Sequence, residues 1–166
     1  LSRCVSVLAA GREADIILDD LSLKNNYSGS NALKHAATMN SLMAIHLAQL
    51  HPGTSFVHMS PGVVKTNMLQ NMGFPKWITT PFFFLLTPLS VDIKVSGERH
   101  LYASTSLDFP PKSKNGGVGA YLLDWDNSPV GNVKVLKKAK EEGVAERVWK
   151  HTLEVYRTVC EEGKKW

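Results

Sequence analysis

The fold of this chain is decided by one stretch of its sequence: Phe56-Val57-His58-Met59-Ser60-Pro61-Gly62-Val63-Val64-Lys65-Thr66. Residues 54–60 have the apolar pattern of a buried strand. Pro61-Gly62 ends that strand, because proline cannot donate an amide hydrogen and glycine permits a tight turn. Ligands of open α/β sheets bind beyond the carboxyl ends of the strands, so the stretch predicts a binding site at this turn.

The residues before this stretch predict a long amphipathic helix over 30–50. Its apolar residues recur at spacings of three and four, which gives one stripe along the helix. The stripe consists of Ala32, Ala36, Met39, Met43, Leu47 and Leu50. His51-Pro52-Gly53 ends the helix, because proline cannot continue it and glycine suits the exit. A valine-rich run over 3–10 predicts an earlier strand, buried on both faces as parallel sheets require.

The rest of the chain continues the alternation of helix and strand. We expect a helix over 91–104, a final strand within 116–125, and two C-terminal helices divided at Gly143. This order predicts an α/β fold: a parallel, doubly wound, Rossmann-like sheet with right-handed crossovers and helices on both faces. Only three strands are indicated, where a complete nucleotide-binding domain has about six. We therefore expect residues 1–166 to be one incomplete domain, the C-terminal half of such a fold.

Composition narrows the class of protein. The 166 residues are 43% hydrophobic and 20% charged, as in ordinary globular domains. The net charge of +4 comes largely from the run 134–140, which we interpret as a solvated helix face, and no nucleic-acid partner is expected. Cys4 and Cys160 lie at opposite ends of the chain, which favours a reducing compartment, the cytoplasm.

The segment 77–89 is intensely apolar but is interrupted by Pro81 and Pro88. It is too short for a membrane-spanning helix, which needs about 20 apolar residues. A lid over an apolar substrate or a subunit contact is the preferred interpretation. Contact with a membrane surface is a less favoured alternative.

Tyr27 stands at the start of the predicted helix, and the order of tyrosine, helix, strand and Pro61-Gly62-x-x-x-Thr66 resembles the catalytic half of the short-chain dehydrogenase/reductase family. The motif Tyr27-Ser28-x-x-Asn31-Ala32 is similar to a fungal branch of NAD(P)-binding oxidoreductases. The resemblance covers nearly the whole chain. It implies an enzyme that interconverts a carbonyl and a secondary alcohol with NADP or NAD. It also implies that Tyr27 is the general acid and that Pro61, Gly62, Val64 and Thr66 line the nicotinamide pocket.

The chain departs from the family pattern in three places. The family has a lysine four residues after its tyrosine, where this chain has Asn31, which is uncharged and can orient a ribose hydroxyl. A phenol ordinarily has a pKa near 10, so it needs a neighbouring cation to act near neutrality. The family's serine falls near Leu8 or Ala9, both apolar, and Asn26, Ser28 and Ser30 are candidates to replace it. The glycine-rich pyrophosphate turn is missing, so we expect this chain alone to be inactive.

Each candidate also has a plain structural interpretation. Pro61-Gly62 could be an ordinary turn with Thr66 capping the next helix. Tyr27 could pack on the sheet, and we interpret His35 as a helix–loop hydrogen-bonding residue first and a proton shuttle second. The six histidines show no metal-binding spacing, so no metal site is expected.

Two functions from different classes therefore stand at this point. In the first, the chain is the substrate-side half of an oxidoreductase that acts on a hydrophobic small molecule. In the second, it is a non-catalytic binding or oligomerisation module that keeps the fold. The chain begins with leucine, so we expect a fragment or an incomplete gene product. Half a sheet exposes an unpaired edge, so we expect homo-oligomers or aggregates.

Overall fold

The computed structural model describes residues 2–64, 66, 75, 77, 81, 90–112 and 117–165. Three strands, β1 (Ser2–Val7), β2 (Thr54–Met59) and β3 (Ala120–Leu123), form a parallel sheet in the order β1-β2-β3. The helices are α1 (Gly29–Leu50), α4 (Ile93–Thr105), α5 (Val133–Glu141) and α6 (Val144–Tyr156). A short 3₁₀ helix, η1 (Leu18–Asp20), and a π-helical turn, η3 (Arg157–Glu161), complete the described elements. The predicted α/β class with a partial Rossmann-like parallel sheet is confirmed.

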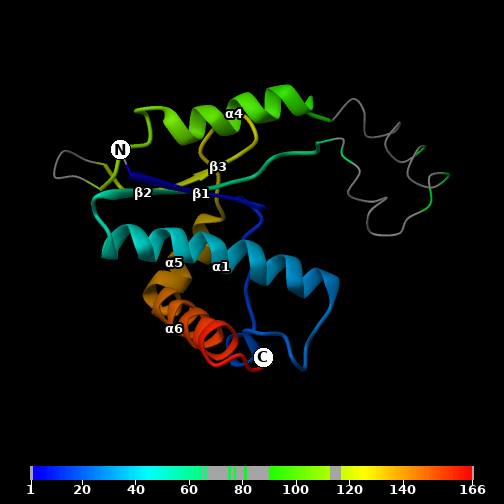
Figure 1. Cartoon of the computed structure of the whole chain (residues 1–166), viewed down its shortest axis with the longest axis vertical. Helices are drawn as coiled ribbons and strands as arrows, with labels where there is room; N and C mark the ends of the chain where they lie inside the picture. The colour runs from blue at the N-terminus through cyan, green and yellow to red at the C-terminus, as the bar shows by residue number, and fades with distance from the viewer. Residues whose placement is uncertain are drawn as a thin grey trace.

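The molecule is layered, with α4 on one face of the sheet and α1 on the other (Figure 1). The alternation of side chains along β2 produces this arrangement. Val57 and Met59 pack with Ala103 of α4, whereas Phe56 packs with Ala44 and Ala48 of α1. The helices α5 and α6 lie on the side of α1 away from the sheet (Figure 1).

The two strand–helix–strand units have opposite hands, and the expectation of right-handed crossovers throughout is wrong. The strands follow one another in the same direction across the sheet, but α1 and α4 lie on opposite faces. One of the two units is therefore left-handed, which is rare in parallel sheets. With both helices on one face, the other face of this small sheet would lack a cover.

The buried face of α1 differs from the predicted apolar stripe. Ala36 and Leu50 are exposed, whereas the buried positions include polar residues such as His35, Thr38 and Ser41. The helix is covered on two sides, since Leu42 packs with Val148 of α6 while Ala44 faces the sheet. Small residues on the sheet side allow close approach, and the polar ones bond to the loop before the helix.

Strand β1 is not buried on both faces as predicted, because it forms an edge of the sheet. Ser2, Cys4 and Val7 are exposed, and within the described residues β1 pairs with β2 alone. Gly143 adopts the left-handed conformation between α5 and α6, which confirms the predicted division there. No helix in the described part of the chain is long and apolar enough to cross a membrane. Apart from Trp77 and Pro81, the apolar segment 77–89 lies outside the described residues, so its predicted role stays a prediction.

Candidate active site

A groove of about 1080 Å³ lies at the carboxyl ends of the three strands. Each strand contributes the residues that follow it, and the start of α4 closes one side. Ligands of open α/β sheets bind at this edge. The lining residues are Leu8, Ala9, Ala10, Gly11, Arg12, Leu33, Ser60, Pro61, Gly62, Val63, Ser90, Val91, Asp92, Val95, Asp124, Trp125 and Val130.

The turn after β2 brings backbone into this groove. Gly62 has a φ of +72°, which favours glycine, and a Cβ atom there would lie 2.8 Å from Cβ of Trp125 and 3.2 Å from Cγ2 of Val91. A side chain at this position would therefore displace the groove wall. Pro61 and Gly62 line the groove together, as the sequence pattern predicts for a ligand-binding turn.

The other two residues of the predicted nicotinamide pocket do not line the groove. Val64 forms a parallel bridge with Val91, and the amide of Val91 donates to the carbonyl oxygen of Val63 at 2.8 Å. This pairing holds the start of α4 against the turn. Thr66 is exposed. Their proposed contacts with a cofactor stay predictions.

Tyr27 lies two residues before α1, and α1 runs antiparallel to the strands, so it begins on the side of the molecule where the strands end (Figure 1). Its side chain is 76% exposed, and it does not line the groove. Asn31 is also outside the groove, and its Nδ2 donates to the carbonyl oxygen of Asn26 at 2.9 Å. Leu33 is the residue of α1 that reaches the groove. The structure thus brings Tyr27 and Asn31 near one another but not into the groove with Pro61 and Gly62.

Two of the three candidates to replace the family's serine, Asn26 and Ser28, form hydrogen bonds with neighbouring residues near the start of α1. Ser28 is the N-cap, and its hydroxyl accepts from the amide of Asn31 at 3.1 Å. The Nδ2 of Asn26 donates to Asp20 at 2.9 Å. Ser30 is exposed on the first turn of α1. A different hydroxyl, that of Ser60, lies in the groove directly before Pro61.

The loop that carries Tyr27 is held by Asp20. The carboxylate of this residue accepts hydrogen bonds at 2.7–2.9 Å from the amides of Lys24, Asn25 and Asn26 and from Nδ2 of Asn26. Burial raises the pKa of a carboxyl, but these hydrogen bonds outweigh it and lower the pKa of Asp20 to about 2. The ionised carboxylate of Asp20 therefore holds in place the loop that leads to Tyr27.

We expect this loop to loosen in acid and in an Asp20→Asn variant. The folded pKa lies below the ordinary value of 3.8, so the contribution is fully present above that value and is lost as the pH falls toward 2. Amides of residues 24–26 should exchange at least severalfold faster in Asp20→Asn at neutral pH, as measured by hydrogen-exchange mass spectrometry. Asp19→Asn is the matched control, because the Asp19 side chain is 97% exposed in its ion pair with Arg147. Equal exchange in both variants would contradict this role.

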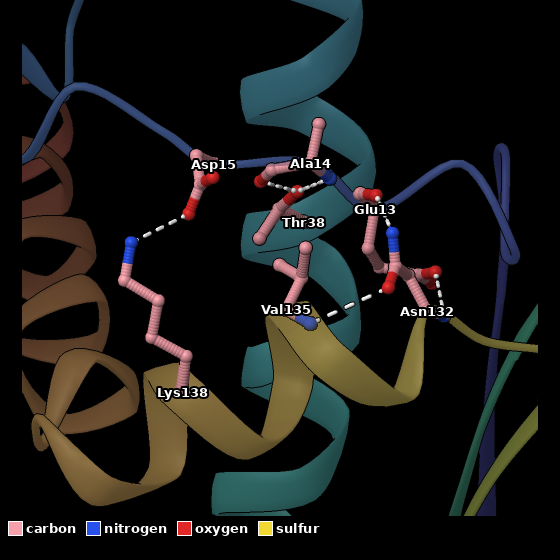
Figure 2. Close-up of polar contacts among 7 residues, drawn as sticks. All are labelled: Glu13, Ala14, Asp15, Thr38, Asn132, Val135 and Lys138. Carbon is pink, nitrogen blue, oxygen red and sulfur yellow. Dashed lines mark hydrogen bonds and ion pairs between the residues drawn. The ribbon is translucent and has the colours of Figure 1, made fainter.

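The wall formed by residues 8–12 is anchored from below by buried polar side chains. Glu13 accepts from the amides of Gly11 at 3.0 Å and of Asn132 at 2.9 Å. Figure 2 shows Glu13 beside Asn132, the N-cap of α5, with Thr38 of α1 bonded to both the amide and the carbonyl oxygen of Ala14. His35 holds the next part of the same connection, since its Nε2 accepts from the amide of Ile17 at 2.9 Å. The interpretation of His35 as a helix–loop hydrogen-bonding residue is confirmed.

Sequence reasoning missed two groove residues near the ends of strands: Ser60, which directly follows β2, and Trp125, the second residue after β3. Ser60 accepts from the amide of Gly62 at 3.4 Å, and its hydroxyl hydrogen remains to be donated. Arg99 lies over the ring of Trp125 at 4.2 Å and donates to its carbonyl oxygen at 3.4 Å, which fixes the indole against the groove. Their position at the carboxyl ends of β2 and β3 is the sequence signal that could have identified them.

Pro61 and Gly62 are the described residues that offer a candidate contact for the nicotinamide end of a cofactor, since both line the groove. The absence of a Cβ at Gly62 lets Trp125 and Val91 pack against this turn. The glycine-rich strand-to-helix turn that binds a pyrophosphate is absent from this sequence. This sequence therefore supplies no such turn for the phosphates of a cofactor. Within the described residues, no group of three or more histidine, cysteine or acidic side chains could hold a metal ion.

Comparison with known proteins gives fungal oxidoreductases as homologues. Oxidoreductase AN1596 from Emericella nidulans is 38% identical over 174 residues, which cover 91% of this chain and 52% of that protein. Oxidoreductase andH from Emericella variicolor is 32% identical over 179 residues, covering 95% of this chain and 53% of that protein. The NmrA-like family domain-containing oxidoreductase notO, from an Aspergillus species, is 26% identical over 177 residues, or 98% of this chain and 51% of that protein.

The chain spans about half the length of these curated relatives. No protein-family model and no solved structure matches it. The similarity relates the chain to about half of fungal proteins that are named as oxidoreductases.

Proposed function

We propose that this chain forms the substrate-side half of an NAD(P)-dependent oxidoreductase of the short-chain dehydrogenase/reductase type. The reaction is the interconversion of a carbonyl and a secondary alcohol on a hydrophobic small molecule. The observation that carries the proposal is the groove at the carboxyl ends of the strands, with the Pro61-Gly62 backbone exposed in it. Its wall includes apolar residues such as Leu8, Val95 and Trp125, which would contact a hydrophobic substrate, beside polar ones.

The cofactor, NADP or NAD, supplies the hydride when it is bound. Pro61 and Gly62 would hold its nicotinamide at the turn, and Val64 and Thr66, which do not line the groove, would lie beside them along the chain. Tyr27 would donate the proton to the carbonyl oxygen, which requires its side chain to turn from its exposed position toward the groove, and Asn31, four residues later, would orient a ribose hydroxyl. In this proposal the groove hydroxyl of Ser60 donates a hydrogen bond to the same oxygen in place of the family's serine.

The second candidate is a non-catalytic binding or oligomerisation module. It is favoured by Asn31 in the position of the family's lysine and by the exposure of Tyr27 outside the groove. The two candidates differ in their requirement for the tyrosine hydroxyl, which only the oxidoreductase needs.

Cofactor binding tests the proposed location. In the protein that carries this chain, we expect saturable binding of NADPH or NADH by calorimetric titration, and Gly62→Ala should weaken it about tenfold or more, a loss of about 1.4 kcal/mol. The new Cβ would contact Trp125 and Val91, and a left-handed backbone costs a non-glycine residue about 1–2 kcal/mol.

Gly97→Ala is the matched control, because a Cβ at Gly97 meets nothing within 4 Å. This variant should bind as the unaltered protein does. Full affinity in Gly62→Ala would indicate that the cofactor binds elsewhere. An absence of binding in the unaltered protein would contradict the proposal that the protein uses NADP or NAD.

A further inference from the structure

A continuous hydrogen-bonded chain of three side chains lies beneath the groove: Glu13, Ser41 and His58. Ser41 and His58 are fully buried, and Glu13 is 3% exposed. The hydroxyl of Ser41 lies 2.6 Å from Oε1 of Glu13 and 2.8 Å from Nδ1 of His58. Glu13 lies in the connection before α1, Ser41 lies on α1 and His58 lies on β2. The hydrogen bonds among the three side chains therefore link α1 to the sheet.

The donors and acceptors determine where each proton lies in the hydrogen bonds that join Glu13, Ser41 and His58. Glu13 accepts from two backbone amides, those of Gly11 and Asn132, and an ionised carboxylate can only accept. Ser41 therefore directs its hydroxyl hydrogen to Glu13 and accepts from Nδ1–H of His58. Nε2 of His58 is left without a proton, which agrees with its role as acceptor of the Ala9 amide at 3.2 Å.

The hydrogen-bonded side chains of Glu13 and His58 hold the groove wall at two points. The amide of Ala9 bonds to His58 and the amide of Gly11 bonds to Glu13, and both residues line the groove. The wall and the three buried side chains are therefore connected by hydrogen bonds, and the bond to the Ala9 amide depends on the protonation state of His58.

We propose that Glu13, Ser41 and His58 are positioning residues that hold the groove wall over residues 8–12, and that protonation of His58 releases this wall. The inference rests on the proposed function only in that the groove is the proposed binding site. When a proton adds to Nε2, that nitrogen changes from acceptor to donor and faces the Ala9 amide, which is also a donor. The Ala9 bond is then lost, and the wall must move to relieve two opposed N–H groups.

The surroundings of His58 favour its neutral form. Burial lowers the pKa of His58, and the charge of Glu13 opposes this effect in part. Beside His58 in the sheet lie Ser6 of β1 and Leu122 of β3, whose side chains do not titrate near neutral pH. Among the described residues, Glu13 is the charged group that acts on it.

The direction of the pH effect follows. An unfolded histidine titrates near 6.5, and the folded pKa of His58 lies lower, so the unfolded state binds its proton first. The stabilisation is fully present above about 6.5 and is lost as the pH falls through the folded pKa.

Two measurements test the proposal without cofactor or substrate, so the outcome is separate from that of the oxidoreductase proposal. The ¹⁵N NMR spectrum of the imidazole should show His58 neutral near pH 7, with its proton on Nδ1. Hydrogen-exchange mass spectrometry should show protection of residues 8–12 falling by about tenfold per pH unit as the pH drops from about 6.5 toward the folded pKa of His58, after correction for intrinsic exchange.

The variant His58→Gln keeps an acceptor for the Ala9 amide but does not titrate, so protection of residues 8–12 should become independent of pH in this range. His35→Gln is the matched control, because His35 is also buried and also accepts an amide of the same connection, outside the groove. It should retain the acid-induced loss. A proton on Nε2 of His58 in the unaltered protein would overturn the proposal even if the variant did not fold, and so would the same acid-induced loss in His58→Gln.

Discussion

A Tyr27→Phe variant is expected to lose about a hundredfold or more in turnover, the range for removal of a general acid. The substitution removes the hydroxyl that would protonate the substrate oxygen and leaves the ring. The side chain is 76% exposed, so the free energy of unfolding should hardly change. Turnover would be measured with NADPH or NADH and a panel of hydrophobic ketones and alcohols, from mildly acidic to mildly alkaline pH.

Two further variants separate catalysis from structure. Tyr156→Phe is the matched control, because Tyr156 is also exposed and lies on α6, away from the groove. Asn31→Lys places an ammonium on the first turn of α1, four residues after Tyr27; a cation near the phenol favours the phenolate and should move the acidic limb of the oxidation profile to lower pH. An unchanged rate in Tyr27→Phe across the panel would contradict the enzyme mechanism and favour the non-catalytic module.

The order of elements could be predicted because each has a local signal. The apolar run before Pro61-Gly62 gave β2, and the helix ending at His51-Pro52-Gly53 gave α1 within one residue. The opposite hands of the two units could not be predicted, because the pattern of a partly apolar helix such as α4 does not show which face of the sheet it covers. The buried face of α1 was missed for a related reason: the helix is covered on two sides, and its buried contacts include hydrogen bonds.

The candidate site was only partly accessible from sequence. Pro61 and Gly62 carry a strong turn signal, and the structure places both in the groove. Glu13, Ser41 and His58 carry no such signal, because polar residues are usually exposed. Their burial is stable only when each finds a partner, and those partners lie 17 to 119 residues away along the chain.

Replacement of Glu13 by alanine is expected to reduce the free energy of unfolding by about 3 kcal/mol or more, since each buried donor left without an acceptor costs about 1–3 kcal/mol. The carboxylate serves three donors: Ser41 Oγ and the amides of Gly11 and Asn132. The loss would be measured by chemical unfolding in the protein that carries this chain. Asp15→Ala is the matched control, because the Asp15 side chain is 74% exposed in its ion pair with Lys138 (Figure 2), and exposed pairs contribute at most about 1 kcal/mol.

The pH dependence of the same variant distinguishes the loss of an ionised acceptor from a general packing defect. Burial raises the pKa of Glu13, but hydrogen bonds from Ser41, Asn132 and Gly11 outweigh it and hold that pKa below its ordinary value of 4.5. This contribution is therefore present above pH 4.5 and is lost as the pH falls through the folded pKa. The difference in stability between the unaltered protein and Glu13→Ala should shrink in acid, whereas a packing defect would leave the difference constant. Equal losses in Glu13→Ala and Asp15→Ala at neutral pH would show that the buried chain does not hold the β1–α1 connection in place.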